Sequence, residues 1–193
     1  MPKPSAFVRA CAALLLSALL CACVKTPEAP DPTPQGVVKG FYDWRIHSQM
    51  TGAPDAQQLA EMQPYISAEL HELLAKVRPE ATDAKPAKKK KQRGKRAFAE
   101  GDLFSSIFDG PTTFKIDDVA TQGADQFVPV TFTSAKQLPS INWVDRVKVI
   151  NENGHYVVAD IEYASHWEFG VRATLIDALQ GKTPPRKIKS QRG

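Results

Sequence analysis

Cysteine is scarce in this sequence and is confined to its beginning. The 193-residue chain has three cysteines, Cys11, Cys21 and Cys23, and the body that follows them has none. A body without cysteine can form no internal disulfide bond, so its stability has to come from a hydrophobic core. The length suits one ordinary globular domain and is too short for two full ones.

The sequence also lacks the short motifs that mark common catalytic and binding sites. It has no His-Glu-x-x-His, no paired-cysteine motif in the body, no glycine-rich phosphate loop and no Gly-x-Ser-x-Gly. These absences leave metalloprotease, zinc-binding, nucleotide-binding and serine-hydrolase functions without support. We therefore predict a protein that is not an enzyme and that uses neither a metal nor a cofactor.

Long apolar runs are missing too, apart from a short one near the N-terminus. Residues 10–20 are almost entirely apolar, but this run is too short to cross a bilayer comfortably as a permanent helix. Lys3 and Arg9 precede it, and a basic segment followed by an apolar segment is typical of a secretory signal peptide. We predict that residues 1–22 are such a signal.

The end of the apolar run, Leu20-Cys21-Ala22-Cys23, resembles the lipobox of bacterial lipoproteins. The resemblance implies cleavage before Cys23 and lipid attachment to it, because small Ala22 suits the cleavage position better than bulky Leu20. An ordinary signal peptide that leaves an unmodified thiol is the alternative. Each buried acyl methylene contributes about 0.8 kcal/mol, so several chains anchor a protein durably. Val24, in place of the aspartate associated with inner-membrane retention, implies the periplasmic side of the outer membrane.

Basic residues are concentrated in two segments. Residues 85–96 hold eight basic side chains and no acidic one, and residues 182–193 hold five more. Blocks of like charge repel and bury little, so we expect both segments to be solvated. The first is either a tolerated surface loop or a contact for anionic lipid or an acidic partner, and export leaves no role for nucleic acid. The candidate contacts are Lys88, Lys89, Lys90, Lys91, Arg93, Lys95 and Arg96.

Composition divides the exported part of the chain into three. Residues 23–35 would hold the lipidated cysteine and a spacer, because four prolines favour an extended chain there. Residues 36–181 would form a single domain that includes the basic loop 85–96. Residues 182–193 would form a basic tail.

Apolar residues at helical spacing predict helices in the first half of this domain. One helix is expected over residues 34–47, with Pro34 at its first position. A second helical region begins near Asp55, is interrupted at Pro64 and resumes after Ser67.

After the basic loop, apolar residues alternate with period two. Asn153 and Gly154 lie between two such runs, which is the strongest local signal for a β-hairpin. A short final helix that ends at Gly181 is predicted by Val171, Leu175, Ala178 and Leu179. The predicted fold is α+β, with N-terminal helices packed on a curved antiparallel sheet of about four strands and a short C-terminal helix, in a cone that could be like that of nuclear transport factor 2. The expected strands lie around residues 114–116, 128–132, 141–149 and 155–163.

Several segments together resemble a known family. They are Phe41-Tyr42-Asp43-Trp44-Arg45-Ile46, Gln63-Pro64-Tyr65-Ile66-Ser67 leading to Leu70 and Leu73-Leu74, residues 102–106, and residues 156–163. The chain is similar in these to the YbjP-like family of small enterobacterial lipoproteins, which is defined by a domain of unknown function. The sequence departs from it in the lysine-rich insertion and in having no cysteine in the body. The resemblance implies location and fold and attaches no reaction.

Aromatic residues supply a candidate pocket, although rings at strand and helix spacing are more often part of a core. Asp160 is notable because alternation over residues 156–162 would direct the acidic side chains of this strand to one face. The candidate pocket residues are Tyr42, Trp44, Trp143, Asp160 and Tyr163.

Two functions remain open at this point. The first is a non-catalytic protein-interaction or accessory module of the cell envelope, held to the membrane by lipid and docked on an outer-membrane or periplasmic protein. The alternative is a small-molecule or glycan binder, or an enzyme, that uses an aromatic-lined cone pocket.

Overall fold

Helices come first along the chain and a sheet follows. The computed structural model describes residues 32–78, 98, 100–136, 138–164 and 173–182. The expected signal peptide, Cys23, most of the spacer, the basic loop 85–96 and all but the first residue of the basic tail lie outside the described residues. The helices are α1 (Pro34–Ser48), α2 (Ala56–Met62), the 3-10 helix η1 (Gln63–Tyr65), α3 (Ala68–Val77) and α5 (Leu175–Leu179).

Each of the first three α-helices begins at a side chain that caps it. Thr33, Asp55 and Ser67 occupy the N-cap positions of α1, α2 and α3, and each accepts a hydrogen bond from a backbone N–H of the first turn. Pro64 lies in η1, where the second helical region changes to a tighter helix. The predicted starts and the predicted interruption are therefore confirmed.

Five strands form one antiparallel sheet in the order β1-β3-β4-β5, with β2 also paired to β3. The α+β class is confirmed, with one strand more than expected. The additional strand is β2, whose three residues are all exposed, so no alternation of apolar residues marks it in the sequence. The strands are β1 (Thr113–Ile116), β2 (Ala120–Gln122), β3 (Asp125–Ser134), β4 (Ile141–Glu152) and β5 (His155–Glu162).

The predicted hairpin joins β4 to β5. Glu152 pairs with His155, so the turn has only two residues, Asn153 and Gly154. Their φ angles are 54° and 87°, the left-handed conformation that a two-residue turn of this kind requires and that this pair tolerates best.

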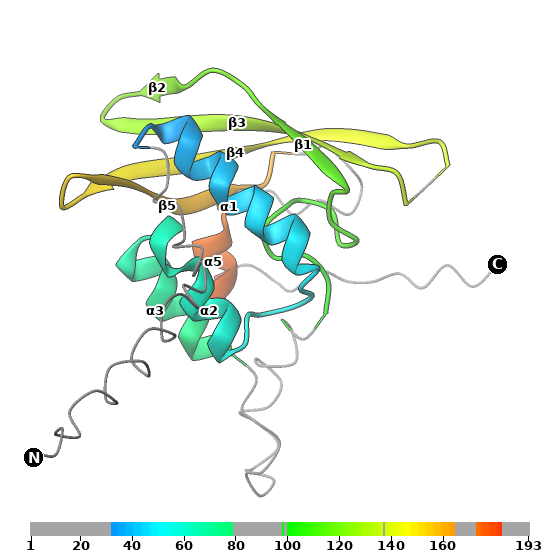
Figure 1. Cartoon of the computed structure of the whole chain (residues 1–193), viewed down its shortest axis with the longest axis horizontal. Helices are drawn as coiled ribbons and strands as arrows, with labels where there is room; N and C mark the ends of the chain where they lie inside the picture. The colour runs from blue at the N-terminus through cyan, green and yellow to red at the C-terminus, as the bar shows by residue number, and fades with distance from the viewer. Residues whose placement is uncertain (1–31, 79–97, 99, 137, 165–172, 183–193) are drawn as a thin grey trace, which may run out of the picture.

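The helices lie on one side of the sheet, and α1 crosses its inner face (Figure 1). The core is formed between α1, the other helices and the inner side chains of the strands. Each large apolar side chain buried there contributes about 1.5–3 kcal/mol, so this core supplies the stability that disulfide bonds do not. Its largest fully buried members are Tyr42, Phe41, Phe104, Phe132, Met62, Leu70, Leu74, Ile161 and Leu175.

The outer face of the sheet is polar and self-paired. Lys148 contacts Asp125 at 2.8 Å and Arg146 contacts Glu162 at 3.2 Å. The Arg146 guanidinium also lies 4.2 Å above the ring of Phe127 and shields it from solvent. Charged side chains therefore pair with one another over part of the outer face.

Both edges of the sheet are short or covered. On the β5 side, Ile66 forms a bridge with Val158, and Thr174 forms one with Glu162. On the other side, β1 has four residues and β2 has three. Little unpaired strand is therefore left along either edge.

Candidate functional site

The most concentrated group of polar contacts among the described residues surrounds a loop, residues 101–110, between the helices and the sheet. The loop closes on itself, because the Asp102 N–H donates to the Phe108 carbonyl at 2.8 Å and the Gly110 N–H donates to the Ile107 carbonyl at 3.0 Å. Gly101 has a φ of 83° and Gly110 has a φ of 68°, so glycine is required at both ends.

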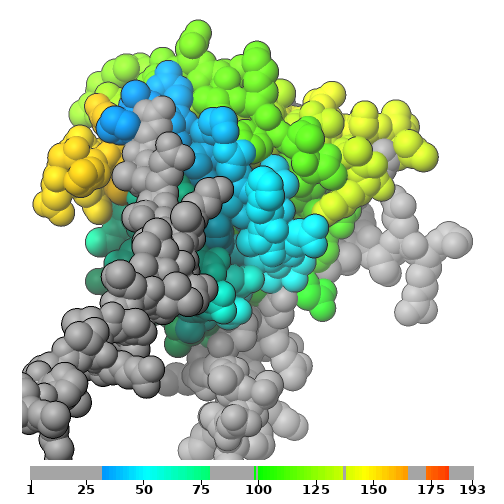
Figure 2. Space-filling model, in the orientation of Figure 1, coloured from blue at the N-terminus to red at the C-terminus, as the bar shows by residue number. Residues whose placement is uncertain are grey.

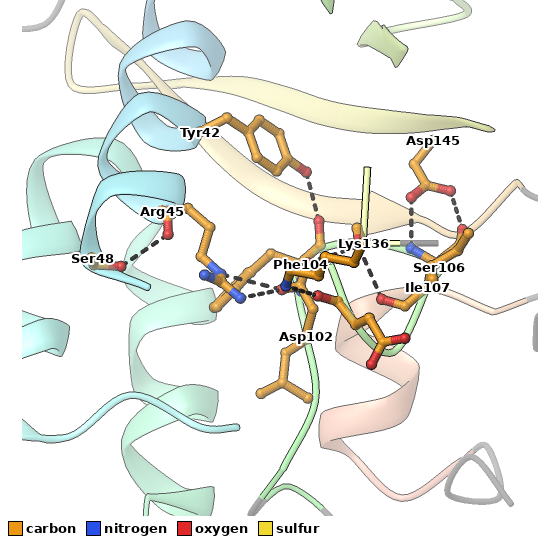
Figure 3. A network of polar contacts seen from close by, with 12 residues as sticks. Tyr42, Arg45, Ser48, Asp102, Phe104, Ser106, Ile107, Lys136 and Asp145 are labelled. Carbon is orange, nitrogen blue, oxygen red and sulfur yellow. Dashed lines mark hydrogen bonds and ion pairs between the residues drawn. The ribbon is translucent and has the colours of Figure 1, made fainter. Parts of the chain in front are cut away.

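Asp102 organises the loop from within. Its side chain is buried, and its Oδ1 accepts hydrogen bonds from the Phe104 N–H at 3.0 Å and from Arg45 Nε at 3.2 Å and Nη2 at 3.0 Å. Its Oδ2 accepts from the Ser105 hydroxyl at 2.7 Å. The carboxylate thus fixes the shape of the 101–110 loop and ties it to α1 (Figure 3).

Asp145 holds the same loop from the side of the sheet. It is fully buried on β4 and accepts from the Ser106 N–H at 2.7 Å, the Ser106 hydroxyl, Trp143 Nε1 at 3.1 Å and the Ala164 N–H at 3.0 Å. All four donors are uncharged, so this carboxylate is solvated by dipoles alone. Burial raises the pKa of Asp145 from its usual value, and the hydrogen bonds from Ser106, Ala164 and Trp143 offset part of that rise.

Two tyrosine hydroxyls hold the backbone of the loop. Tyr42 donates to the Phe104 carbonyl at 2.8 Å, and Tyr163 donates to the Leu103 carbonyl at 2.5 Å. Burial, followed by the nearby Asp145 and Asp102 carboxylates, raises the pKa of Tyr42 well above its usual value. The Tyr42 hydroxyl therefore keeps its proton and remains a donor.

This arrangement can hold a loop, but it does not present a reactive group. Ser105 and Ser106 are buried, so neither hydroxyl is offered to a substrate from solvent. His47, His71 and His155, the histidines among the described residues, belong to α1, α3 and the start of β5. In the part of the chain that the structure describes, no cluster of His, Cys, Asp and Glu side chains could hold a metal ion.

The four aromatic residues among the pocket candidates separate into two groups. Tyr42, Trp143 and Tyr163 are buried in the core and donate their polar hydrogens to the network around the 101–110 loop. Trp44 is partly buried and lies apart from this network, with its Nε1 donating to Glu61 at 3.1 Å. Tyr42, Trp143 and Tyr163 are therefore part of the core, as the alternative interpretation expected. A ligand pocket stays a prediction.

Asp160 is the fifth candidate, and it anchors the final helix. Its Oδ1 accepts from the Ile176 N–H in the first turn of α5 at 2.9 Å and from the Ile161 N–H at 2.8 Å. Burial raises the pKa of Asp160, and these hydrogen bonds together with one to Thr174 lower it in part. In the structure its role is to fix α5 against β5.

Sequence reasoning did not single out Arg45, Asp102 or Asp145, although the sequence carries a signal for two of them. Asp145 follows Trp143 and precedes Val147 in the inward phase of a strand, where an acid is unusual. Arg45 continues the buried face of α1 one turn after Phe41. The signal in the sequence was therefore a charged residue at a position where the periodicity of the strand or helix predicts an apolar one.

No protein-family model, curated protein or solved structure matches this chain. The resemblance to the YbjP-like family accordingly stays a prediction. No helix among the described residues is both long and apolar enough to span a membrane.

Proposed function

We propose that this protein is a lipid-anchored module of the bacterial cell envelope, tethered through Cys23 to the periplasmic face of the outer membrane, and that its domain docks non-catalytically onto another envelope protein. The observation that carries the docking is an exposed apolar tip on the β3–β4 hairpin. Leu138 is 98% exposed at this tip, and Val144 on β4 is 42% exposed. They are the two large apolar side chains most exposed to solvent among the described residues.

The buried polar network supports a binding role over a catalytic one. Asp102 and Asp145 are committed to the 101–110 loop, and the two serines that they contact are buried with them. Catalysis needs acids, bases or nucleophiles within reach of a substrate. The described polar side chains at the centre of the fold instead hold the 101–110 loop in one shape.

The position of the hairpin suits a partner away from the membrane. The β3–β4 hairpin and the start of α1 lie at opposite ends of the sheet (Figure 1), and the hairpin projects beyond the body of the domain (Figure 2). Thr33 lies ten residues after Cys23, a length of chain that reaches about 35 Å at most. A tether of that length would keep the start of α1 near the bilayer and direct Leu138 toward the periplasm.

The anchor is tested by the mass of the membrane form. We expect the intact mass of the membrane-extracted protein to begin at Cys23 and to include several acyl chains. We expect Cys23→Ser to abolish this modification and to release the protein from the membrane fraction. An unmodified Cys23 in the membrane form would refute the lipid anchor while leaving the docking proposal open.

Docking is tested by a photo-crosslinking residue introduced at Leu138 in the full chain in cells. We expect one dominant crosslinked partner, whose yield falls when Cys23 is replaced by serine. The matched control is the same crosslinker at Thr121, an exposed position on β2 at the other end of β3. Equal crosslinking from both positions, or none from Leu138, would contradict docking at the hairpin.

A substitution provides a second readout for the same surface. We expect Leu138→Asp to reduce co-purification of the crosslinked partner at least tenfold. We also expect it to change the free energy of unfolding by less than about 0.5 kcal/mol, because an exposed side chain packs against little. Thr121→Asp should leave both measurements unchanged.

A further inference from the structure

Asp145 has a buried carboxylate that joins several parts of the chain. It contacts residues of three parts of the chain: Ser106 in the 101–110 loop, Trp143 on β4, and Ala164 just after β5. The guanidinium of Arg45 is bound by Asp102, so it does not serve as the counter-charge of Asp145. Among the described residues, the donors to Asp145 are therefore uncharged, whereas Asp102 is paired with a cation.

We propose that Asp145 is a proton-binding switch, which takes up a proton when the surroundings become acidic and thereby fastens the 101–110 loop more firmly to the sheet. The inference is independent of the proposed docking function, since it concerns the loop and not the hairpin tip.

The contact between Asp145 and Ser106 allows the carboxyl to be protonated without losing a hydrogen bond. In the ionised state the Ser106 hydroxyl donates to the carboxylate. A serine hydroxyl is donor and acceptor at once, and its hydrogen can rotate. When Asp145 carries a proton, the carboxyl O–H can donate to Ser106 Oγ while the Ser106 N–H, Trp143 and Ala164 continue to donate to Asp145. The bond to the hydroxyl reverses direction, and the buried charge disappears.

The groups around Asp145 determine the sign of the effect. Among the described residues, Tyr42 on α1 lies close enough to Asp145 for the carboxylate to raise its pKa, and Asp102, Tyr163 and Arg45 act on the same hydroxyl. Asp102 is ion-paired with Arg45, whereas Asp145 accepts hydrogen bonds from uncharged donors. Burial among uncharged donors favours the neutral form of Asp145.

The linkage follows from the direction of the shift at Asp145. Its pKa in the folded protein is raised above the ordinary 3.8. A carboxyl with a raised folded pKa binds protons more readily when folded, so its contribution to stability is largest below the ordinary pKa and declines as pH rises through the folded pKa. As pH falls from the folded pKa toward the ordinary pKa, the closed loop should be favoured by up to about tenfold per pH unit.

The test is amide hydrogen exchange of the full chain in detergent between pH 4 and pH 8, corrected for the intrinsic exchange rate. We expect protection of peptides from the 101–110 loop to rise as pH falls in the wild type, and we expect this pH dependence to disappear in Asp145→Asn. Asp160→Asn is the matched control. It removes another carboxyl with a raised pKa, but at α5, so the pH dependence of the loop should persist.

The sign of the wild-type result decides the question even if Asp145→Asn fails to fold. Protection that falls with acidification would overturn the proposal. Protection that does not depend on pH would overturn it as well. Infrared spectra offer a measurement without substitution, in which the band of a buried protonated carboxyl should appear as pH is lowered.

Discussion

Replacing Arg45 with methionine is expected to lower the free energy of unfolding by about 3–5 kcal/mol, because it removes the guanidinium that pairs with the buried Asp102 carboxylate. The Arg45 side chain is 10% exposed and that of Asp102 is 2% exposed, so solvent screens this pair little. Methionine preserves much of the apolar volume of the arginine stem, which separates the loss of charge from the loss of packing. Urea denaturation at neutral pH measures the difference.

The same helix offers a matched control for this experiment. Lys39 and Asp43 form an ion pair on α1 whose side chains are 65% and 44% exposed. An exposed pair one turn apart contributes about 0.3–0.5 kcal/mol, so Lys39→Met should have only a small effect. Equal stability of the two methionine variants would show that the contacts of Arg45 do not hold the 101–110 loop. A double variant with Asp102→Asn should lose less than the sum of the two single losses.

Gly101→Ala is expected to lower the free energy of unfolding by about 2–5 kcal/mol, the second large effect. Its φ of 83° is unfavourable for alanine by about 1–2 kcal/mol. A Cβ atom at this position would also lie 2.4 Å from the ring of Phe108, and overpacking of this kind costs about 1–3 kcal/mol more. Thermal and urea unfolding of the variant measure the total.

Gly123→Ala separates the two contributions. Gly123 has a φ of 65°, but a Cβ atom there would meet nothing within 4 Å. We therefore expect only the backbone cost of about 1–2 kcal/mol in this variant. A loss at Gly101 no larger than the loss at Gly123 would argue against tight packing of the loop.

The parts of the fold that the sequence predicts are those governed by local chemistry. The caps at Thr33, Asp55 and Ser67 act within one turn of helix, and the Asn153-Gly154 turn acts within two residues. Periodicity then assigns the inner face of α1 and of the long strands. Each of these signals is complete within a few residues, which is why it can be read without the rest of the chain.

The candidate site could not be predicted in this way, because its contacts are distant in sequence. Arg45 and Asp102 are 57 residues apart, and Ser106 and Asp145 are 39 apart. The 101–110 loop has no periodicity, and its shape depends on side chains from other elements, such as Tyr42, Arg45 and Asp145. The sequence pattern marks Tyr42 and Trp143 by their aromatic rings. In the structure the rings lie in the core, and the O–H and N–H groups also donate hydrogen bonds around the 101–110 loop.

The sequence pattern also did not predict a β-bulge in β5. Alternation placed Val158 and Asp160 on the same face, but in β5 Val158 pairs with Val149 and Asp160 pairs with Lys148. Ala159 is the extra residue of this bulge, so Val158 turns into the core while Asp160 lies on the side of Lys148. A bulge inserts one residue and reverses the phase after it, and the sequence carries no local mark of the change.

The covered edges of the sheet have a consequence for how this protein behaves when many copies are crowded together. A long, flat, unpaired strand is a template on which further chains can add and grow into aggregates. Here β1 and β2 are too short to serve as such a template, and Ile66 and Thr174 already pair with β5. We expect concentrated protein to remain dispersed, without the fibrous growth that exposed strand edges promote.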